Sequence, residues 1–148
     1  MGGRERPARR ARRLAMVALF EAEFPPQKAD VALERLAAEW EVEPAVADQA
    51  RAIVHGVVGH ARELDAEIGS RAPKIPVSEL GRIERTILRS ALFEVLYSRP
   101  IPSGGAIRDA VSLARTYAGE SAARLVGGVL RGVDRSQPVR PEPEGDEG

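Results

Sequence analysis

The stretch SELGRIERTILRSALFEVLY, residues 78–97, decides the fold of this chain. Its aliphatic residues recur at the spacing of one face of an α-helix, and its length at about 1.5 Å per residue spans roughly 30 Å, the width of a small domain. Phe93 and Tyr97 fall on a different side of the same helix. The sequence therefore predicts a central helix that other helices cover on two sides.

Two residues near the start of this stretch modify the prediction. Ser78 is a suitable N-cap, and Gly81 is expected to break the helix close to its beginning. Glu84 is the exception within the apolar face, since it lies among aliphatic residues. An ion pair with an arginine, or a position near the helix N-terminus, would accommodate this charge.

Length and composition limit the class of protein. The 148 residues suit one compact domain with a single core. The chain has no cysteine, which excludes disulfides and thiolate metal sites. It has no run of about 18 apolar residues and no signal-peptide pattern, so we expect a cytoplasmic protein without a membrane segment.

The formal net charge of zero conceals two ends of opposite charge. Residues 1–13 contain six arginines and one glutamate, whereas residues 137–148 contain four acidic residues and one arginine. A basic arm attracts phosphates, and a short acidic tail favours solubility. Lysine occurs only at Lys28 and Lys74, so the arginine content also reflects the composition of the whole chain.

No segment alternates between polar and apolar residues with a period of two, so we expect an all-α fold without a sheet. Helical periodicity, together with proline, glycine and cap signals, predicts six or seven helices. The expected ranges are about 8–24, 30–40 with Asp30 as N-cap, 44–68, 78–97, 103–119 with Ser103 as N-cap, and 121–133. Gly56 and Gly59 interrupt the third range, where they would let another helix approach closely.

The same patterns divide the chain into a flexible basic arm, one helical domain in two halves, and a disordered acidic tail. The expected boundaries are 1–7 for the arm, 8–136 for the domain with halves 8–72 and 76–136, and 137–148 for the tail. A linker around Pro73 and Pro76 separates the two halves in this prediction.

We find no arrangement of residues that would catalyse a reaction, hold a metal or bind a cofactor. His55 and His60 are five residues apart, about 140° around a helix, whereas two metal ligands on one face need a spacing of three or four. We interpret them as two unrelated histidines on helix surfaces. Gly127 and its neighbours lie in a helical pattern, without the strand that a phosphate-binding loop requires.

The basic start of the first helix carries the strongest functional signal. Arg9, Arg10, Arg12 and Arg13 would fan around its first turns, where each guanidinium could bind a phosphate or stack on a base. Cations at a helix N-terminus oppose the helix dipole, so helix formation does not explain them. The alternative is a basic end that only keeps the chain soluble. No element is typical of a recognition helix for duplex DNA, which favours single-stranded RNA as the ligand.

Three blocks of the chain resemble the NusB family, in the order and at the spacing of that family. They are RRARRLAMVALFEAEF at residues 9–24, LGRIERTILRSALFEVLY at residues 80–97 and IPSGGAIRDAVSLARTYAGESAARLVGGVLRGV at residues 101–133. The resemblance runs from about Arg9 to Val133. It implies an all-helical fold of two three-helix halves.

The resemblance also implies a function. Proteins similar to NusB are transcription antitermination factors that bind the boxA segment of ribosomal RNA leaders together with NusE, a small-subunit ribosomal protein. The complex supports transcription of ribosomal RNA operons by RNA polymerase, and no reaction is catalysed. The implied partners are boxA-type single-stranded RNA, NusE and the RNA polymerase antitermination complex.

Site residues of the family carry over to this sequence one by one. The arginine-rich RNA-binding motif of the family corresponds to Arg9, Arg10, Arg12 and Arg13. Phe20 matches an aromatic residue that lies near both RNA and NusE, although here the ring has no hydroxyl. Glu84 matches an acidic residue that faces NusE. Contact with NusE explains this charge about as well as an ion pair with an arginine of the same chain or a position near the helix N-terminus.

Residues 119–128 match a second RNA-contacting region, in which this sequence departs from the family. Leu125 replaces a commonly aromatic residue, Ser121 a commonly acidic one and Gly127 a commonly amide-bearing one. The loss of a ring removes base stacking of about 1–3 kcal/mol. Arg124 retains a cation there. We therefore expect weaker or differently tuned RNA recognition by this region.

Two further hypotheses remain open from the sequence. The chain is a protein interaction module that forms a homodimer and masks its arginines, or it is a stand-alone RNA-binding domain. The second hypothesis rests on related helical domains of ribosomal RNA cytosine methyltransferases. Since the chain ends where their catalytic domain would begin, it is not expected to be an enzyme.

Overall fold

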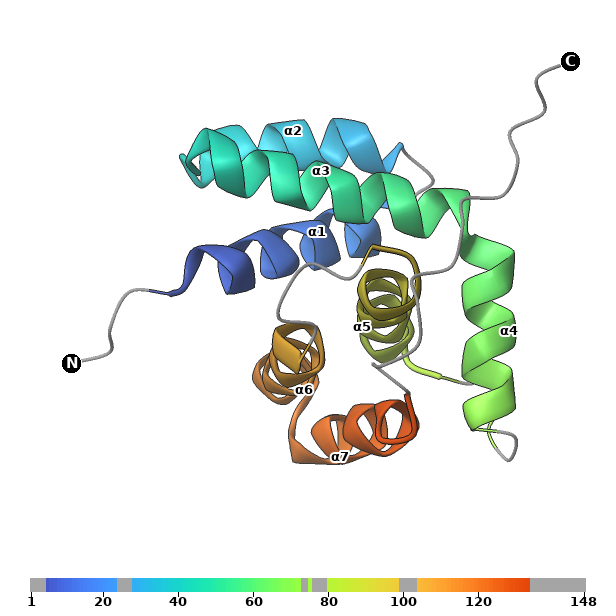
Figure 1. Ribbon diagram of the computed structural model, residues 1–148. Coiled ribbons are helices and arrows are strands. Elements are labelled where there is room, and N and C mark those ends of the chain that lie inside the picture. The colour runs from blue at the N-terminus through green and yellow to red at the C-terminus, as the bar shows by residue number, and fades with distance from the viewer. Residues whose placement is uncertain (1–4, 24–27, 73–74, 76–79, 99–103, 134–148) are drawn as a thin grey trace, which may run out of the picture.

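The computed structural model describes residues 5–23, 28–72, 75, 80–98 and 104–133. In these ranges the chain forms seven α-helices, one π-helical turn and no strand, which confirms the expected all-α class (Figure 1). The helices are α1 (Pro7–Glu23), α2 (Ala29–Glu39), α3 (Pro44–Gly59), α4 (Ala61–Arg71), α5 (Arg82–Phe93), α6 (Gly104–Ala118) and α7 (Glu120–Leu130), and the π-helical turn η2 (Glu94–Ser98) continues α5.

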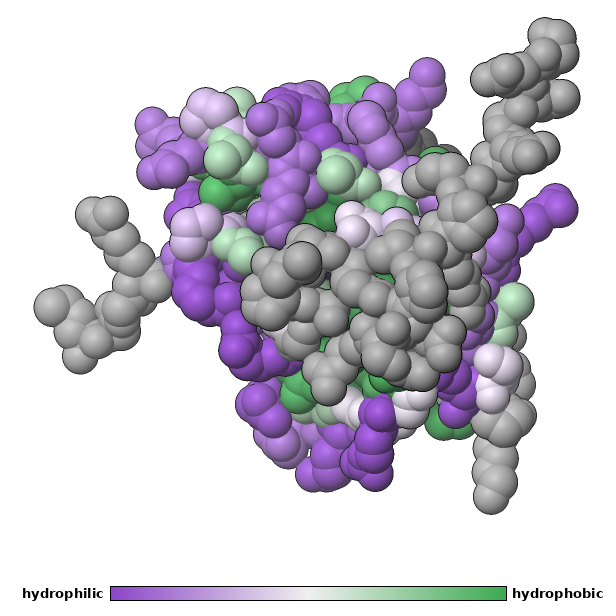
Figure 2. All heavy atoms as spheres, in the orientation of Figure 1, coloured by the Kyte–Doolittle hydropathy of each residue, from purple (hydrophilic) through white to green (hydrophobic). Residues whose placement is uncertain are grey.

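Helix α5 lies at the centre of the molecule, as its sequence predicts. It contacts α1, α3, α4, α6 and α7. Figure 1 shows α1, α2 and α3 on one side of α5, and α6 and α7 on the other. The side chains of Leu88 and Leu92 are fully buried, and so are those of Leu14 in α1, Leu64 in α4 and Leu130 in α7. Hydrophilic residues cover much of the outer surface of the helices in Figure 2.

Two glycines were expected to let another helix approach closely. Gly56 does bring α3 and α5 together, whereas the expectation was wrong for Gly59, where no atom lies within 4 Å of a β-carbon position. A β-carbon built on Gly56 would lie 2.0 Å from Cζ of Phe93, so the Phe93 ring occupies the space of the missing side chain. His60 and Tyr97 complete the cluster, with ring centroids 5.6 Å apart for His60 and Phe93 and 4.1 Å apart for His60 and Tyr97. The second side of the central helix therefore packs through aromatic rings against α3 and against His60, the C-cap residue of α3.

Gly56→Ala is expected to destabilise the fold by about 1–3 kcal/mol, because the new methyl group overlaps a buried ring. The higher helix propensity of alanine, about 1 kcal/mol, offsets only part of this. Gly69→Ala is the matched control in α4, since no atom lies within 4 Å of its β-carbon position, and it should stabilise the protein. Urea unfolding followed by far-UV circular dichroism measures both. Equal stability of the two variants would contradict the tight contact.

Two helix boundaries differ from the expected ones. Asp30 lies inside the first turn of α2 and does not cap it, because Lys28 takes the cap position. The third helical range breaks at His60, whose φ of −118° and ψ of 22° leave the helical region, and α4 then turns away from α3 (Figure 1). This break places His60 against Phe93, so the interpretation of His60 as a surface residue was wrong: its exposure is 4%.

Several predictions fall on residues outside the described ranges. These are the caps Ser78 and Ser103, the linker prolines, residues 1–4 of the arm and the acidic tail. Gly81 is described, and it precedes α5 as its N-cap residue. None of the described helices combines the length and the apolar character that crossing a membrane requires.

Candidate nucleic-acid interface

The four arginines of the basic motif lie in the first two turns of α1. Proline suits the first turn of a helix, and α1 begins at Pro7. At about 100° per residue, successive side chains leave the helix in different directions. The four guanidiniums therefore do not form one uniform surface, and each has its own set of contacts.

Arg12 points into the protein. Its Nε and Nη2 donate to Glu94 at 2.9 and 3.2 Å, and its Nη1 donates to Asp109 at 2.8 Å. All three residues are buried, and Asp109 also pairs with Arg6. Gly105 leaves room for the guanidinium, since a β-carbon there would lie 3.4 Å from Nη1. Burial raises the pKa of Glu94, while the hydrogen bonds and charge of Arg12 oppose that shift.

The Arg12 contacts tie α1 to η2 and α6. This arrangement was missed by the sequence reasoning, because the partners are 82 and 97 residues away from Arg12. A glutamate in the apolar run LFEVLY was the one available signal for Glu94. In this structure Arg12 supports the arginine motif from inside, and its guanidinium is not on the surface.

Arg9 and Arg13 lie at the surface and converge on Glu5. Arg9 Nη1 pairs with the Glu5 carboxylate, and Arg13 donates to it from Nε at 3.0 Å and from Nη2 at 2.8 Å. Although partial burial opposes the shift, the hydrogen bonds from Arg13 and Arg9 lower the pKa of Glu5. The hydrogen bond to Glu5 in turn raises the pKa of Arg13.

Contacts with α6 also hold the surface arginines. Arg9 donates to Ser112 Oγ from Nη2 at 3.0 Å, and Arg13 Nη1 donates to the Tyr117 hydroxyl at 3.4 Å. Together with the Arg6–Asp109 pair, these contacts advance along α1 and α6 in the same order. We call the surface formed by Arg6, Arg9 and Arg13, together with their partners on α6, the basic face. It therefore includes α6 as well as α1.

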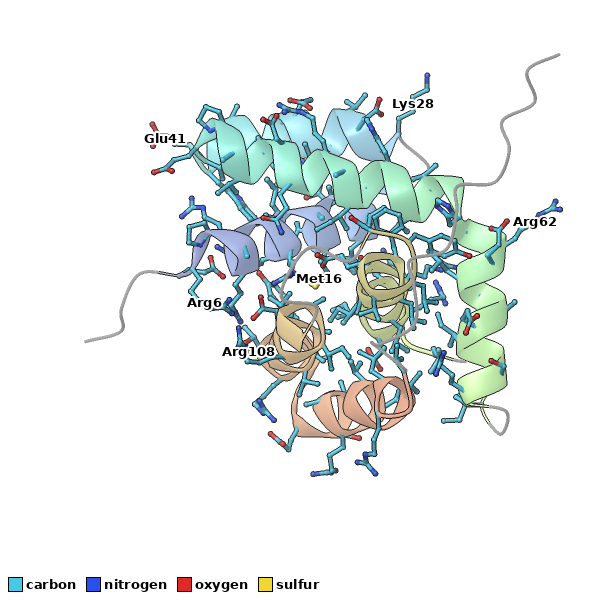
Figure 3. The ribbon with its side chains drawn as sticks, in the orientation of Figure 1. Arg6, Met16, Lys28, Glu41, Arg62 and Arg108 are labelled. Atoms are coloured by element: carbon cyan, nitrogen blue, oxygen red, sulfur yellow. The ribbon has the colours of Figure 1, made fainter. Side chains whose placement is uncertain are left out.

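The C-terminal end of α2 borders the same face. Arg10 Nη2 donates to the carbonyl oxygen of Trp40 at 2.6 Å. The guanidinium of Arg13 lies over the Trp40 ring, 4.5 Å from its centroid. Figure 3 shows Arg6 and Arg108 on this side of the molecule and Arg62, on α4, on the opposite side.

Phe20 and Glu84 lie around the other end of α1. The guanidinium of Arg82 lies over the Phe20 ring at 4.1 Å, and its Nη2 donates to the Phe20 carbonyl oxygen at 3.2 Å. Glu84 is in the first turn of α5, where a β-carbon on Gly81 would meet both of its carboxylate oxygens at 2.7 Å. The structure thus brings Phe20 next to the first turn of α5, and Glu84 has the position near a helix N-terminus that suits a carboxylate.

The second predicted RNA region forms the start and middle of α7. Gly119, with φ 96°, ends α6 and takes the N-cap position of α7, a conformation that glycine adopts readily. Ser121 and Arg124 are exposed, whereas Leu125 is half-buried and packs against the core. Tyr117, which accepts a hydrogen bond from Arg13, lies in α6 two residues before this turn.

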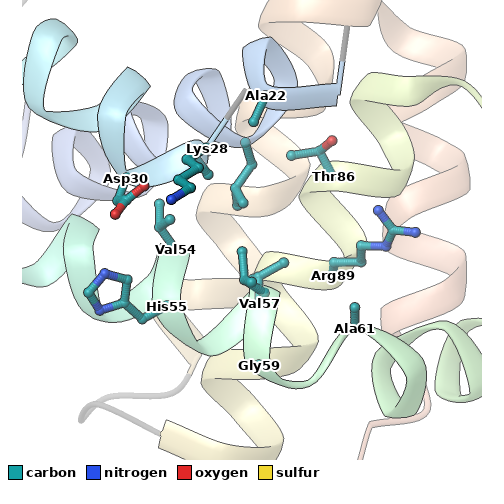
Figure 4. A pocket seen from close by; sticks show the side chains of 13 residues that line it. Ala22, Lys28, Asp30, Val54, His55, Val57, Gly59, Ala61, Thr86 and Arg89 are labelled. Atoms are coloured by element: carbon teal, nitrogen blue, oxygen red, sulfur yellow. The ribbon is translucent and has the colours of Figure 1, made fainter. Parts of the chain in front are cut away.

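A cavity lies elsewhere, between α1, α2, α3, α5 and the start of α4. It has a volume of about 650 Å³ and walls that include Val54, Val57 and Val58 (Figure 4). His55 lies at this cavity, which none of the four motif arginines line. The described ranges contain no group of three or more acidic or histidine side chains that could hold a metal.

Solved structures share this fold. A crystal structure of the antitermination factors NusB and NusE in complex with double-stranded RNA contains a chain that is 25% identical, with a TM-score of 0.79 and coverage of 86% of this chain and 96% of that chain. NusB of T. maritima is 27% identical, with a TM-score of 0.78 and coverage of 86% and 90%. The fold therefore places the chain in a class of small all-helical proteins that includes antitermination factors.

Sequence comparison narrows this class to one family. The model of the NusB family matches residues 9–135. The transcription antitermination protein NusB of Dehalococcoides mccartyi, strain ATCC BAA-2266 / KCTC 15142 / 195, is 34% identical over 128 residues, which cover 86% of this chain and 90% of that protein. The chain belongs to the NusB family.

Proposed function

We propose that this chain is a transcription antitermination factor that binds boxA RNA of ribosomal RNA leaders together with a NusE-type ribosomal protein. In this role it supports transcription of ribosomal RNA operons by RNA polymerase. The observation that carries the proposal is the family match over residues 9–135, which includes both predicted RNA-contacting regions. The contact between Arg13 and Tyr117, two residues before the second region begins, supports the proposal that both regions serve one ligand.

The proposed RNA surface consists of the exposed part of this face. It includes the partly exposed Arg9, Arg10, Arg13 and Leu125 and the exposed Ser121 and Arg124. Phe20, at the other end of α1, is proposed to contact the RNA where it leaves this face towards NusE. Arg12 has a different part in the proposal, because its guanidinium is engaged with two buried carboxylates. It holds the first turns of α1 in place, so that the neighbouring arginines face the RNA.

The proposed NusE surface lies at the opposite end of α1. Phe20, Arg82 and the first turn of α5 form one neighbourhood there, and Glu84 supplies its negative charge. A basic or hydrogen-bonding segment of the partner would match this composition. From Arg9 to Phe20, α1 rises by about 16 Å at 1.5 Å per residue, so RNA and NusE can bind next to each other.

Fluorescence anisotropy of a labelled boxA RNA tests the function, first with this protein alone and then with equimolar NusE from the same organism. We expect NusE to tighten binding at least tenfold, about 1.4 kcal/mol of coupling. If three surface arginines meet phosphates, the slope of log affinity against log salt should be near −2, at roughly −0.7 per contact for single strands.

The same titration separates the alternatives. A double-stranded boxA RNA in a parallel series shows which form the protein prefers. Light scattering of the samples shows whether a homodimer forms and whether RNA dissociates it. Absence of binding to either RNA, with and without NusE, would contradict the antitermination role.

A further inference from the structure

The carboxylate of Glu5 occupies a site that two guanidiniums form. Arg9 contacts it from one side, and Arg13 donates two N–H groups to it from the other. The Glu5 side chain is only 17% exposed, so most of it is enclosed by these contacts. Two converging guanidiniums are the arrangement that binds a phosphate, which presents the same kind of paired oxygen acceptors as a carboxylate.

Glu5 does not by itself hold these arginines in place. Arg9 Nε and Nη2 lie 3.3 and 3.0 Å from Ser112 Oγ. Arg13 donates to the Tyr117 hydroxyl and lies over the Trp40 ring. Each guanidinium therefore keeps an anchor on α6 or α2 when Glu5 leaves, and the site remains formed for another anion.

We propose that Arg9 and Arg13 form a binding site for one phosphate group of the RNA backbone, which Glu5 fills in the free protein and leaves when RNA binds. This inference rests on the proposed function and names a subsite within it. Glu5 is two residues before the start of α1, so a change of the chain before the helix suffices to move it. RNA then exchanges an internal carboxylate for a backbone phosphate.

The exchange has two measurable consequences. Glu5 competes with RNA, so its neutralisation should strengthen binding. Glu5 also reduces the charge of the site from two positive charges to one, and with it the number of counterions that RNA releases. Neutralisation should therefore make the salt dependence of binding steeper. A role of Glu5 in folding alone would produce neither effect.

Glu5→Gln tests the proposal in the full-length chain, because glutamine keeps the shape of the side chain and removes its charge. We expect the variant to bind labelled boxA RNA roughly three- to tenfold more tightly than the unmodified protein, and the salt slope to become steeper by about 0.7. Unchanged far-UV circular dichroism and melting temperature would show that both proteins have the same fold.

Glu67→Gln is the matched control. Glu67 and Arg71 form a pair four residues apart in α4, and their side chains are 18% and 21% exposed, close to the 17% and 21% of Glu5 and Arg9. Figure 1 shows α4 on the opposite side of the molecule from the start of α1. Glu67→Gln changes the net charge by the same amount but at a distance from the site. RNA affinity should therefore stay within about twofold of the unmodified value, and the salt slope should not change.

Trp40 gives a second signal, because it is the only tryptophan and Arg13 lies over its ring. Its fluorescence should change on addition of boxA RNA, because a phosphate replaces the Glu5 carboxylate on the guanidinium that covers the ring. Inorganic phosphate at matched ionic strength should need a concentration at least a hundredfold higher to give the same change. A response to inorganic phosphate at the same concentration as RNA would show a site for free phosphate and overturn the RNA assignment.

The outcomes separate this proposal from the function on which it rests. If the unmodified protein binds boxA RNA and Glu5→Gln binds with equal affinity and equal salt slope, the Glu5 site is rejected and the antitermination role stands. If neither protein binds RNA alone or with NusE, both proposals are rejected. Tighter binding by Glu5→Gln and not by Glu67→Gln supports the site.

Discussion

Arg12→Met is expected to lower the free energy of unfolding by about 3–5 kcal/mol, the loss typical of removing one partner from a buried ion pair. The variant keeps an aliphatic side chain of similar length but leaves Glu94 buried without its cation and Asp109 with only the exposed Arg6. Urea unfolding at pH 7, followed by far-UV circular dichroism, measures the change. A second variant with Glu94→Gln and Asp109→Asn added should recover part of the loss, because the stranded charges are then gone.

The effect of Arg12→Met should also depend on pH. Burial already raises the pKa of Glu94 in the unmodified protein, and removal of Arg12 takes away the interaction that opposes this shift. A carboxyl group whose pKa is higher in the folded state than in the unfolded state favours folding as the pH falls through that raised pKa. The deficit of the variant should therefore shrink between pH 7 and pH 5. A deficit that stays constant would show that lost packing causes it.

Arg51→Met is the control for burial, because it removes an arginine that also pairs with two carboxylates but at the surface. Arg51 contacts Glu34 at 2.6 Å and Asp48 at 2.7 Å, but all three side chains are exposed to solvent. Exposed ion pairs contribute about 0–1 kcal/mol. The Arg51 variant should thus lose less than about 1 kcal/mol, and a loss as large as that of Arg12→Met would contradict the importance of burial.

Charge reversal of the surface pair, Arg9→Glu with Arg13→Glu, should reduce the affinity for boxA RNA about 100-fold at ~0.1 M salt. At each of the two positions the substitution removes an attraction to phosphate and adds a repulsion, together about 1.4 kcal/mol. Each substitution therefore lowers the affinity about tenfold. Anisotropy titration gives the affinity. Melting temperatures are needed beside it, because the new glutamates also repel Glu5.

Lys28→Glu with Arg62→Glu changes the net charge by the same amount at two exposed basic residues, one at the start of α2 and one in α4, away from the basic face of α1 and α6. Figure 3 shows Arg62 on the far side of the molecule from Arg6. We expect this control to reduce affinity by less than about fivefold, since a screened charge beyond about 10 Å acts weakly at this salt concentration. Equal losses in the two double variants would mean that RNA responds to net charge and not to the proposed face.

Periodicity in the sequence was sufficient to predict the fold. The apolar pattern of residues 78–97 identified the central helix, and the side to which Phe93 belongs indicated a second contact surface. Gly56 in an apolar helix correctly indicated a close approach, because a missing side chain there leaves space that a neighbour fills. These features follow from the spacing of residues within one helix, and that spacing can be read from the sequence.

The remaining features depend on contacts between distant parts of the chain. Arg12 looks like its neighbours in the sequence, and only the packing of α6 and η2 against α1 distinguishes it. His60 gave no signal of burial, because the helical pattern continues past the break that turns it toward Phe93. In the sequence Glu5 is a single acidic residue among six arginines, and nothing there indicates which of them it contacts. The structure shows that it pairs with Arg9 and Arg13.

The ordered contacts between α1 and α6 have one more consequence. Arg6, Arg9 and Arg13 meet partners that are 103, 103 and 104 residues further along, so a shift of either helix by one turn would break all three contacts together. The two helices are thus held in one register, which fixes how the parts of the proposed RNA surface from different ends of the chain face each other. Side chains that are already held in position lose less conformational entropy on binding, so more of the interaction of Arg9 and Arg13 with RNA contributes to affinity.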